Sequence, residues 1–143
     1  MKGKILVFFQ FFFIFLMLLP IGSEVHYLKT GLVIIAFGLL IGFSAIKQHS
    51  SGNFNIVPDI KENCTLVTDG VYAYIRHPMY ASVIVSMFGV LSIYATYSEL
   101  LLFGLLCVNM LVKLLYEESL WHCKSEEYIN YTKKTKRLIP FVF

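Results

Sequence analysis

Residues 70–80 read Gly70-Val71-Tyr72-Ala73-Tyr74-Ile75-Arg76-His77-Pro78-Met79-Tyr80. This polar, aromatic and basic run stands directly before a long apolar segment, in a chain that is rich in hydrocarbon side chains. Charged residues beside a bilayer are costly to place, so Arg76 and His77 indicate a functional site. Two plainer interpretations stay open on residue types alone: Arg76 as a topology anchor, and His77 before Pro78 as the start of a helix.

The composition is that of a membrane protein. Of the 143 residues, 57% are hydrophobic and 15% are charged, and the mean hydropathy is +0.70. This balance is typical of membrane chains and not of soluble domains. The cysteines at 64, 107 and 123 form neither a Cys-x-x-Cys pair nor a Cys/His ligand spacing, so we expect no disulfide framework and no metal site.

Four apolar runs predict an all-α integral membrane protein with about four transmembrane helices. The spans are predicted at about residues 5–22, 31–46, 79–94 and 100–116. The first run is interrupted by Gln10 alone between Ile5 and Leu19; it is long for a signal peptide and lacks a small-x-small cleavage site, so an uncleaved span is favoured. In the second run, the spacing Gly38-x-x-x-Gly42 allows close helix contact.

Polar segments complete a single domain over residues 1–143. The segment 47–78 is too polar to span a membrane, and loops of this length are usually functional. Pro78 suits the first turn of a helix and disfavours a helical His77, so the third span is predicted to begin near Met79. The basic and aromatic segment 117–143 predicts a tail with a short helix at the membrane interface.

Basic residues predict the orientation in the membrane. Lys2 and Lys4 precede the first span, the segment 47–78 carries further basic residues, and five follow the fourth span, whereas Lys29 alone falls on the other side. The positive-inside rule therefore places both termini and the segment 47–78 in the cytoplasm. The membrane would be the endoplasmic reticulum in a eukaryote or the inner membrane in a bacterium.

The third and fourth spans form a predicted hairpin with its turn near Tyr97. Arg76 and Glu118 are equally far from Tyr97 in sequence, so Arg76 should lie at the same depth as Glu117 and Glu118, within about 2–4 residues. Lys113 and Glu117 are one helical turn apart on one face. The pattern predicts a polar pocket at the rim of the bilayer; the alternative is an exposed ion pair that closes the hairpin and contributes about 0–1 kcal/mol.

Two blocks of residues carry a resemblance to a known family. The first block comprises Asn53-Phe54-Asn55, Thr65-Leu66-Val67-Thr68-Asp69-Gly70-Val71-Tyr72 and Arg76-His77-Pro78-Met79-Tyr80. The second block comprises Glu117-Glu118, Glu127-Tyr128, Tyr131, Arg137 and Ile139-Pro140. In this order they resemble the signature of the isoprenylcysteine carboxyl methyltransferase family, integral-membrane enzymes that use S-adenosylmethionine.

Some positions depart from the family pattern. Ser82 stands where glycine is usual, Lys124-Ser125 replaces a Phe-Gly pair, and the spacing from the two glutamates to Tyr128 is about one residue short. The assignment of the family's glutamate to Glu117 or Glu118 therefore stays open. We prefer Glu117, because Lys113 then stands one turn earlier, where relatives carry a basic residue. That residue is typically arginine, and lysine cannot grip a carboxylate in the same bidentate way.

The resemblance implies a cofactor site for S-adenosylmethionine and roles for named residues. The implied cofactor-binding residues are Cys64, Thr65, Leu66, Val67, Tyr72, His77, Pro78, Met79, Tyr80 and Glu117. Arg76 and Glu117 are the predicted catalytic residues: Arg76 orients the acceptor with Lys113 as a second cation, and Glu117 orients the cofactor. The chain has no Gly-x-Gly-x-x-Gly motif after a strand, so a soluble dinucleotide-type fold is not expected.

The expected methyl acceptor is the α-carboxylate of a prenylated cysteine, which reaches the site from the bilayer. An α-carboxylate is ionised at neutral pH, so no general base is needed to create the nucleophile. Two alternatives stay open: a phospholipid amine or small thiol as the acceptor, and a non-catalytic small membrane protein. No nucleic-acid partner is expected, and an oligomer is possible, since a partner helix would help to enclose a cofactor and a lipid.

Overall fold

The computed structural model describes residues 2–19, 24–48, 56–58 and 65–143. Within these ranges the secondary structure is helical: α1 (Lys2–Met17), α2 (Leu28–Lys47), η1 (Gly70–Ala73), α3 (Pro78–Tyr94), α4 (Tyr97–Lys124) and α5 (Glu126–Lys134). The predicted all-α class is confirmed for the described part of the chain. Asn53, Phe54, Asn55 and Cys64 lie outside the described residues.

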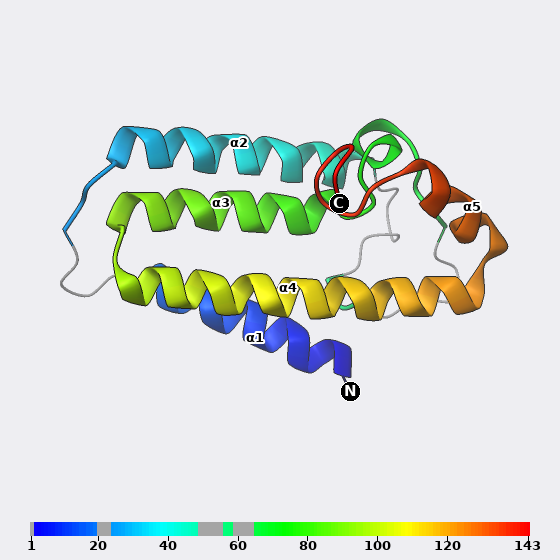
Figure 1. Cartoon of the computed structure of the whole chain (residues 1–143), viewed down its shortest axis with the longest axis horizontal. Helices are drawn as coiled ribbons and strands as arrows, with labels where there is room; N and C mark the ends of the chain where they lie inside the picture. Colours follow the sequence, from blue (N-terminus) through cyan, green and yellow to red (C-terminus); the bar gives the residue numbers. More distant parts are fainter. Residues whose placement is uncertain (1, 20–23, 49–55, 59–64) are drawn as a thin grey trace.

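The long helices lie side by side, with α3 between α2 and α4 and with α1 against α4 (Figure 1). Their shared core contains Met17, Val90, Leu106 and Met110, all buried. The 3₁₀-helix η1, α5 and the C-terminal segment gather at one end of this bundle (Figure 1). The candidate site forms at that end.

Small residues let α2 and α3 approach closely. A Cβ atom added to Gly38 would lie 2.7 Å from the backbone nitrogen of Ser86. Ser82 donates a hydrogen bond from its hydroxyl to the carbonyl of Gly38 at 2.8 Å, and Gly42 also faces Ser82. The close helix contact predicted from the Gly38-x-x-x-Gly42 spacing is confirmed.

Replacing Gly38 with alanine is therefore expected to lower the free energy of unfolding by about 1–3 kcal/mol, because the new methyl group forces two backbones apart. Thermal unfolding in a mild detergent measures the effect. Gly104→Ala is the matched control, because a Cβ there meets no atom within 4 Å. Equal melting temperatures for the two variants would contradict this packing.

The turn between α3 and α4 is shorter than predicted. Ala95 ends α3 in the left-handed region, with φ 49° and ψ 35°. The hydroxyl of Thr96 then accepts a hydrogen bond from the backbone N–H of Glu99 at 3.2 Å, which caps α4 so that the helix begins at Tyr97. The turn is Ala95–Thr96, whereas the sequence predicted a span beginning near residue 100.

Helix α4 also continues beyond residue 116, the predicted end of the fourth span, and ends at Lys124. Glu117 and Glu118 thus lie inside a helix and not in a tail. Tertiary contacts stabilise this extension of α4, because Glu118 is buried in ion pairs with Arg76 and Arg137. The chain then turns at Ser125, whose hydroxyl accepts a hydrogen bond from the N–H of Tyr128 at 3.4 Å and begins α5.

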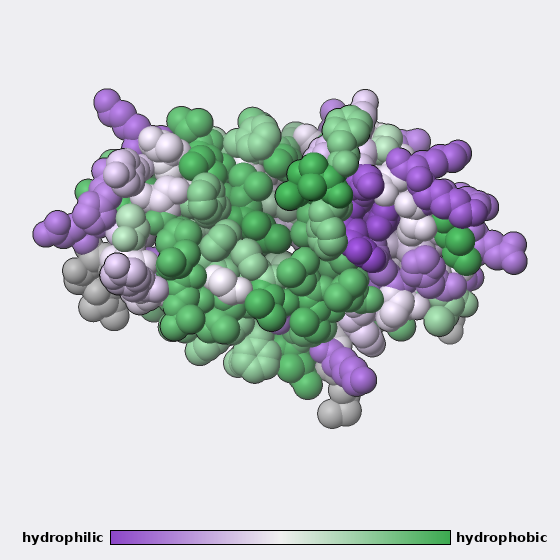
Figure 2. Space-filling view, in the orientation of Figure 1, coloured by the Kyte–Doolittle hydropathy of each residue, from purple (hydrophilic) through white to green (hydrophobic). Residues whose placement is uncertain are grey.

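Among the described residues, two helices, α2 and α4, are long and apolar enough to cross a membrane. Only 17% of the most apolar window of α2 is buried inside the protein, so this helix turns hydrocarbon outward, as a lipid-facing helix does and a soluble core helix does not. Figure 2 shows an apolar band over the middle of the helices and hydrophilic residues over the α5 end. The count of four spans stays a prediction, because α1 and α3 are shorter.

Candidate active site

The C-terminal segment folds back onto residues 74–77. The backbone N–H of Arg76 donates to the carbonyl of Lys136 at 2.7 Å, and that of His77 donates to the carbonyl of Arg137 at 3.0 Å. These bonds join the two sequence blocks, which are about 60 residues apart. The described residues of both blocks therefore lie together at one site.

Pro78 explains why His77 is available for this pairing. The ring of Pro78 disfavours a helical conformation for the residue before it, and His77 has φ −123° and ψ 56°. Helix α3 begins at Pro78, one residue before the predicted Met79. The side chain of His77 is then directed toward α4, where it meets Glu118.

The 3₁₀-helix η1 holds Tyr72 at the site. Gly70 begins it with φ 59°, a left-handed value that glycine adopts readily, and a Cβ there would lie 2.6 Å from Cδ of Gln48 at the end of α2. The hydroxyl of Tyr131 in α5 donates to the carbonyl of Tyr72 at 2.5 Å. Tyr72 is thereby fixed between α2 and α5.

Glu118 is the centre of a buried ionic cluster. Its carboxylate accepts hydrogen bonds from Nε of Arg76 and from Nε of Arg137, each at 2.9 Å, and Nε2 of His77 lies 3.4 Å from Oε1. The Glu118 side chain is 5% exposed. A buried carboxylate is tolerated when it is paired in this way, so Glu118 ties α4 to the start of α3 and to the C-terminal segment.

Two of the three guanidinium nitrogens of Arg76 donate hydrogen bonds. Besides the bond from Nε to Glu118, its Nη1 donates to the carbonyls of Thr132 and Thr135 at the end of α5. The predicted hairpin brings Arg76 to the depth of Glu117 and Glu118, and the structure pairs Arg76 with Glu118. Arg76 therefore has a clear architectural role in addition to its predicted role in catalysis.

Glu117 lies on a different side of α4 and meets Tyr80. The hydroxyl of Tyr80 donates to Oε2 of Glu117 at 2.5 Å. The ring of Tyr80 is stacked on His77 with centroids 5.3 Å apart, and Nζ of Lys113 lies over the same ring, 4.9 Å from its centroid. Tyr80 is thus held by three predicted site residues.

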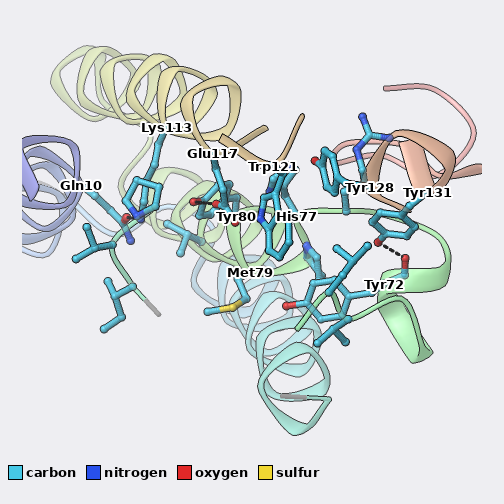
Figure 3. Close-up of a pocket in the computed structure, with 18 of the residues that line it drawn as sticks. Gln10, Tyr72, His77, Met79, Tyr80, Lys113, Glu117, Trp121, Tyr128 and Tyr131 are labelled. Atoms are coloured by element: carbon cyan, nitrogen blue, oxygen red, sulfur yellow. Dashed lines mark hydrogen bonds between the residues drawn. The ribbon is translucent and has the colours of Figure 1, made fainter. Parts of the chain in front are cut away.

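These side chains border a cavity of about 360 Å³, within the range of small-molecule sites. Figure 3 shows Tyr80, Glu117 and Lys113 on one side of it and Tyr72 on the other. The predicted site residues that line it are Thr65, Leu66, Val67, Tyr72, Arg76, His77, Pro78, Met79, Tyr80, Lys113 and Glu117.

Ten further lining residues were not predicted as site residues, among them Gln10, Trp121, Tyr128 and Tyr131. Gln10 comes from α1, where it interrupts an otherwise apolar run, and that interruption was the available signal. The three aromatic residues were assigned to an interfacial tail. They reach the cavity because α4 continues to Lys124 and α5 folds back, with Trp121 stacked on Tyr128 at 5.6 Å.

The tyrosines of the wall are neutral hydrogen-bond donors at physiological pH. Burial raises the pKa of Tyr72, and the nearby carboxylate of Glu117 raises it further. Burial raises the pKa of Tyr131 to about 12, and burial also raises the pKa of Tyr128. The hydroxyl of Tyr128 is buried without a hydrogen-bond partner among the described residues, so a polar ligand in the cavity would satisfy it.

Comparison with known proteins gives one family match and several similar proteins. The family model described as phospholipid methyltransferase matches residues 26–124. The protein-S-isoprenylcysteine O-methyltransferase of Mus musculus is 30% identical over 124 residues, which cover 79% of this chain and 41% of the mouse protein. The protein of the same name from Schizosaccharomyces pombe is 27% identical over 119 residues, which cover 81% of this chain and 50% of the yeast protein.

The match with the protein of the same name from Xenopus laevis is 30% identical over 115 residues, which cover 78% of this chain and 40% of the frog protein. The chain spans half or less of the length of these relatives. The family model covers the first sequence block and the start of the second. The similar proteins confirm the resemblance found in the sequence.

Proposed function

The chain belongs to the phospholipid methyltransferase family, whose model matches more than half of it, and we propose that it is a membrane methyltransferase that uses S-adenosylmethionine to methylate the α-carboxylate of a prenylated cysteine. The observation that carries this proposal is the shared cavity. Residues of both sequence blocks line it, with Glu117 and Lys113 on one wall. The names of the similar proteins favour the prenylcysteine acceptor.

The residues of the cavity fit S-adenosylmethionine, which carries a sulfonium cation, an adenine and an amino-acid end. The ring of Tyr72 offers an aromatic face to the cation, whereas the ring of Tyr80 is already stacked on His77 and lies under Lys113. The carboxylate of Glu117 supplies the negative charge, and the unpartnered hydroxyl of Tyr128 supplies a donor. When bound, S-adenosylmethionine supplies an electrophilic methyl group.

The protein's own work is to orient the acceptor and exclude water, because an α-carboxylate is already ionised at neutral pH. Lys113 is 2% exposed to solvent, yet it is one of the residues that line the cavity. We propose that Lys113 is the main residue that binds the acceptor carboxylate. Arg76 is less available, because its Nε donates a hydrogen bond to Glu118 and its Nη1 donates to carbonyls of α5. Arg76 then holds the wall of the site and offers its remaining nitrogen as a second donor.

Apolar side chains continue from the polar end of the cavity toward the apolar band of the protein. They are contributed by α1 (Phe11 and Ile14) and by α3 (Met79 and Val83). Such a wall suits a prenyl chain that arrives from the bilayer. In this arrangement α1 to α4 span the membrane, and both termini and the segment 47–78 face the cytoplasm, in the endoplasmic reticulum or a bacterial inner membrane.

The test is methyl transfer from labelled S-adenosylmethionine by purified protein in nanodiscs. Three acceptors are compared: N-acetyl-S-farnesylcysteine, phosphatidylethanolamine and a small alkyl thiol. Transfer to the farnesylcysteine alone supports the proposal. Transfer to the amine or to the thiol alone would show that this compound is the acceptor in place of prenylcysteine. If the folded protein binds no cofactor, the enzymatic function is rejected.

The variant Lys113→Met is expected to raise KM for the farnesylcysteine acceptor about 10-fold or more, because one charge-assisted hydrogen bond is worth about 1.5–3 kcal/mol. The affinity for the cofactor product S-adenosylhomocysteine should change less. Lys113→Arg is the control, because it keeps the charge. An unchanged KM in Lys113→Met would show that another group holds the acceptor.

A further inference from the structure

Gln10 is the polar residue of α1 that faces the site. Its side chain lies on the buried side of a helix whose other large side chains are mostly exposed, and the residue is 7% exposed. Its Oε1 accepts a hydrogen bond from Nζ of Lys113 at 2.8 Å. A buried amide is costly without such a partner, so this contact favours the orientation of α1 in which Gln10 faces α4.

The ammonium of Lys113 is left without an ionic partner by this arrangement. The three ion pairs among the described residues all involve Glu118, and Lys113 is in none of them. Glu117 lies one helical turn from Lys113, yet its carboxylate is engaged by Tyr80. The neutral oxygen of Gln10 thus holds a cation at the cavity wall without cancelling its charge.

We propose that Gln10 is a positioning residue for acceptor selection: it holds the Lys113 ammonium in the cavity, so that acceptors ending in a carboxylate bind in preference to uncharged ones. This inference rests on the proposed function. Without the amide of Gln10, Lys113 is free to turn toward Glu117, one turn away on the same face. The two charges would then cancel, and the cavity would lose its preference for an anion.

A merely structural role for Gln10 can be separated from this one, because the chain has a second polar contact between α1 and α4. Nδ2 of Asn109 donates to the carbonyl of Leu6 at 3.1 Å. Asn109 and Lys113 are one turn apart on α4, as are Leu6 and Gln10 on α1. Asn109→Leu therefore removes a comparable contact between the same helices and leaves Lys113 and Gln10 in place.

The experiment measures the binding of two probes, farnesylthioacetic acid and its uncharged methyl ester, to the full chain in detergent. Trp121 is the single tryptophan of the chain and lines the cavity, so its fluorescence reports binding. The readout is the ratio of the two dissociation constants. Gln10→Leu removes the acceptor of the hydrogen bond, whereas Gln10→Glu keeps the contact with Lys113 and cancels its charge.

We expect the wild type and Asn109→Leu to bind the acid about 10-fold more tightly than the ester. In Gln10→Leu and Gln10→Glu the ratio should fall to near one. A ratio near one in the wild type, an unchanged ratio in Gln10→Glu, or an equal loss in Asn109→Leu would overturn the inference. Wild-type preference for the acid without methyl transfer to farnesylcysteine would instead support the inference and reject the proposed reaction.

Discussion

Replacing Glu118 with alanine is expected to lower the free energy of unfolding by about 3–5 kcal/mol, the usual effect of removing one partner of a buried ion pair. The Arg76 side chain is 8% exposed and would lose the partner of its Nε. Arg137 would lose its bond to the same carboxylate. The connection between α4, the start of α3 and the C-terminal segment would therefore loosen.

Thermal unfolding in detergent measures this effect, with protease susceptibility of the C-terminal segment as a second readout. Glu117→Ala is the matched control, because it removes the neighbouring carboxylate from the same helix. Its melting temperature should stay near that of the wild type, since Glu117 accepts one hydrogen bond, from Tyr80, and is less buried. Similar melting temperatures for the two variants would contradict the role assigned to the cluster.

Glu117→Ala is expected to lower activity and not stability. Its kcat/KM for methyl transfer should fall about 100-fold, as when a preorganised charged group is removed from an active site. The dissociation constant of S-adenosylhomocysteine should rise with it, because Glu117 is the carboxylate of the cavity wall. Equilibrium binding and initial rates, measured on the same preparation, check both expectations.

The variant Tyr80→Phe separates the contribution of the Tyr80 ring from that of its hydroxyl. It keeps the aromatic ring next to Lys113 and His77 but removes the donor to Glu117. Its loss of activity should be smaller than that of Glu117→Ala. Full activity in Glu117→Ala, with unchanged cofactor binding, would contradict the role proposed for Glu117. The glutamate that is typical of the family would then be Glu118, or this position would have no role in the mechanism.

Helix geometry explains why two adjacent glutamates differ so much. Successive residues of an α-helix are rotated by about 100°, so Glu118 faces the two arginines while Glu117 faces Tyr80 and the cavity. The sequence predicted that both would reach the depth of Arg76. It left the choice between them open, because depth is a property of the hairpin, whereas direction depends on the rotation of α4.

Other features of the fold followed from local rules in the sequence. Pro78 predicts the start of α3 within one residue, and the spacing of Gly38 and Gly42 predicts the contact with α3. These rules depend on residues close in sequence. The sequence also predicts that Arg76 lies near Glu118, because a short turn aligns the two arms of a hairpin.

The remaining features depend on partners that are distant in sequence. Gln10 meets Lys113 only because α1 packs on α4, a pairing that the apolar pattern of α1 does not specify. The aromatic residues after Glu118 have the composition of an interfacial tail. The structure instead folds Tyr131 back onto Tyr72 and places both in the cavity wall.

The identity of the methylated product is the decisive measurement for the proposed function. Purified protein is incubated with deuterium-labelled S-adenosylmethionine and N-acetyl-S-farnesylcysteine, and the product is analysed by tandem mass spectrometry and alkaline hydrolysis. The proposed function predicts a labelled methyl group on the α-carboxylate, released by base as methanol, in the wild type and not in Glu117→Ala. A base-stable methyl group, or no methylated prenylcysteine from protein that binds S-adenosylmethionine, would contradict it.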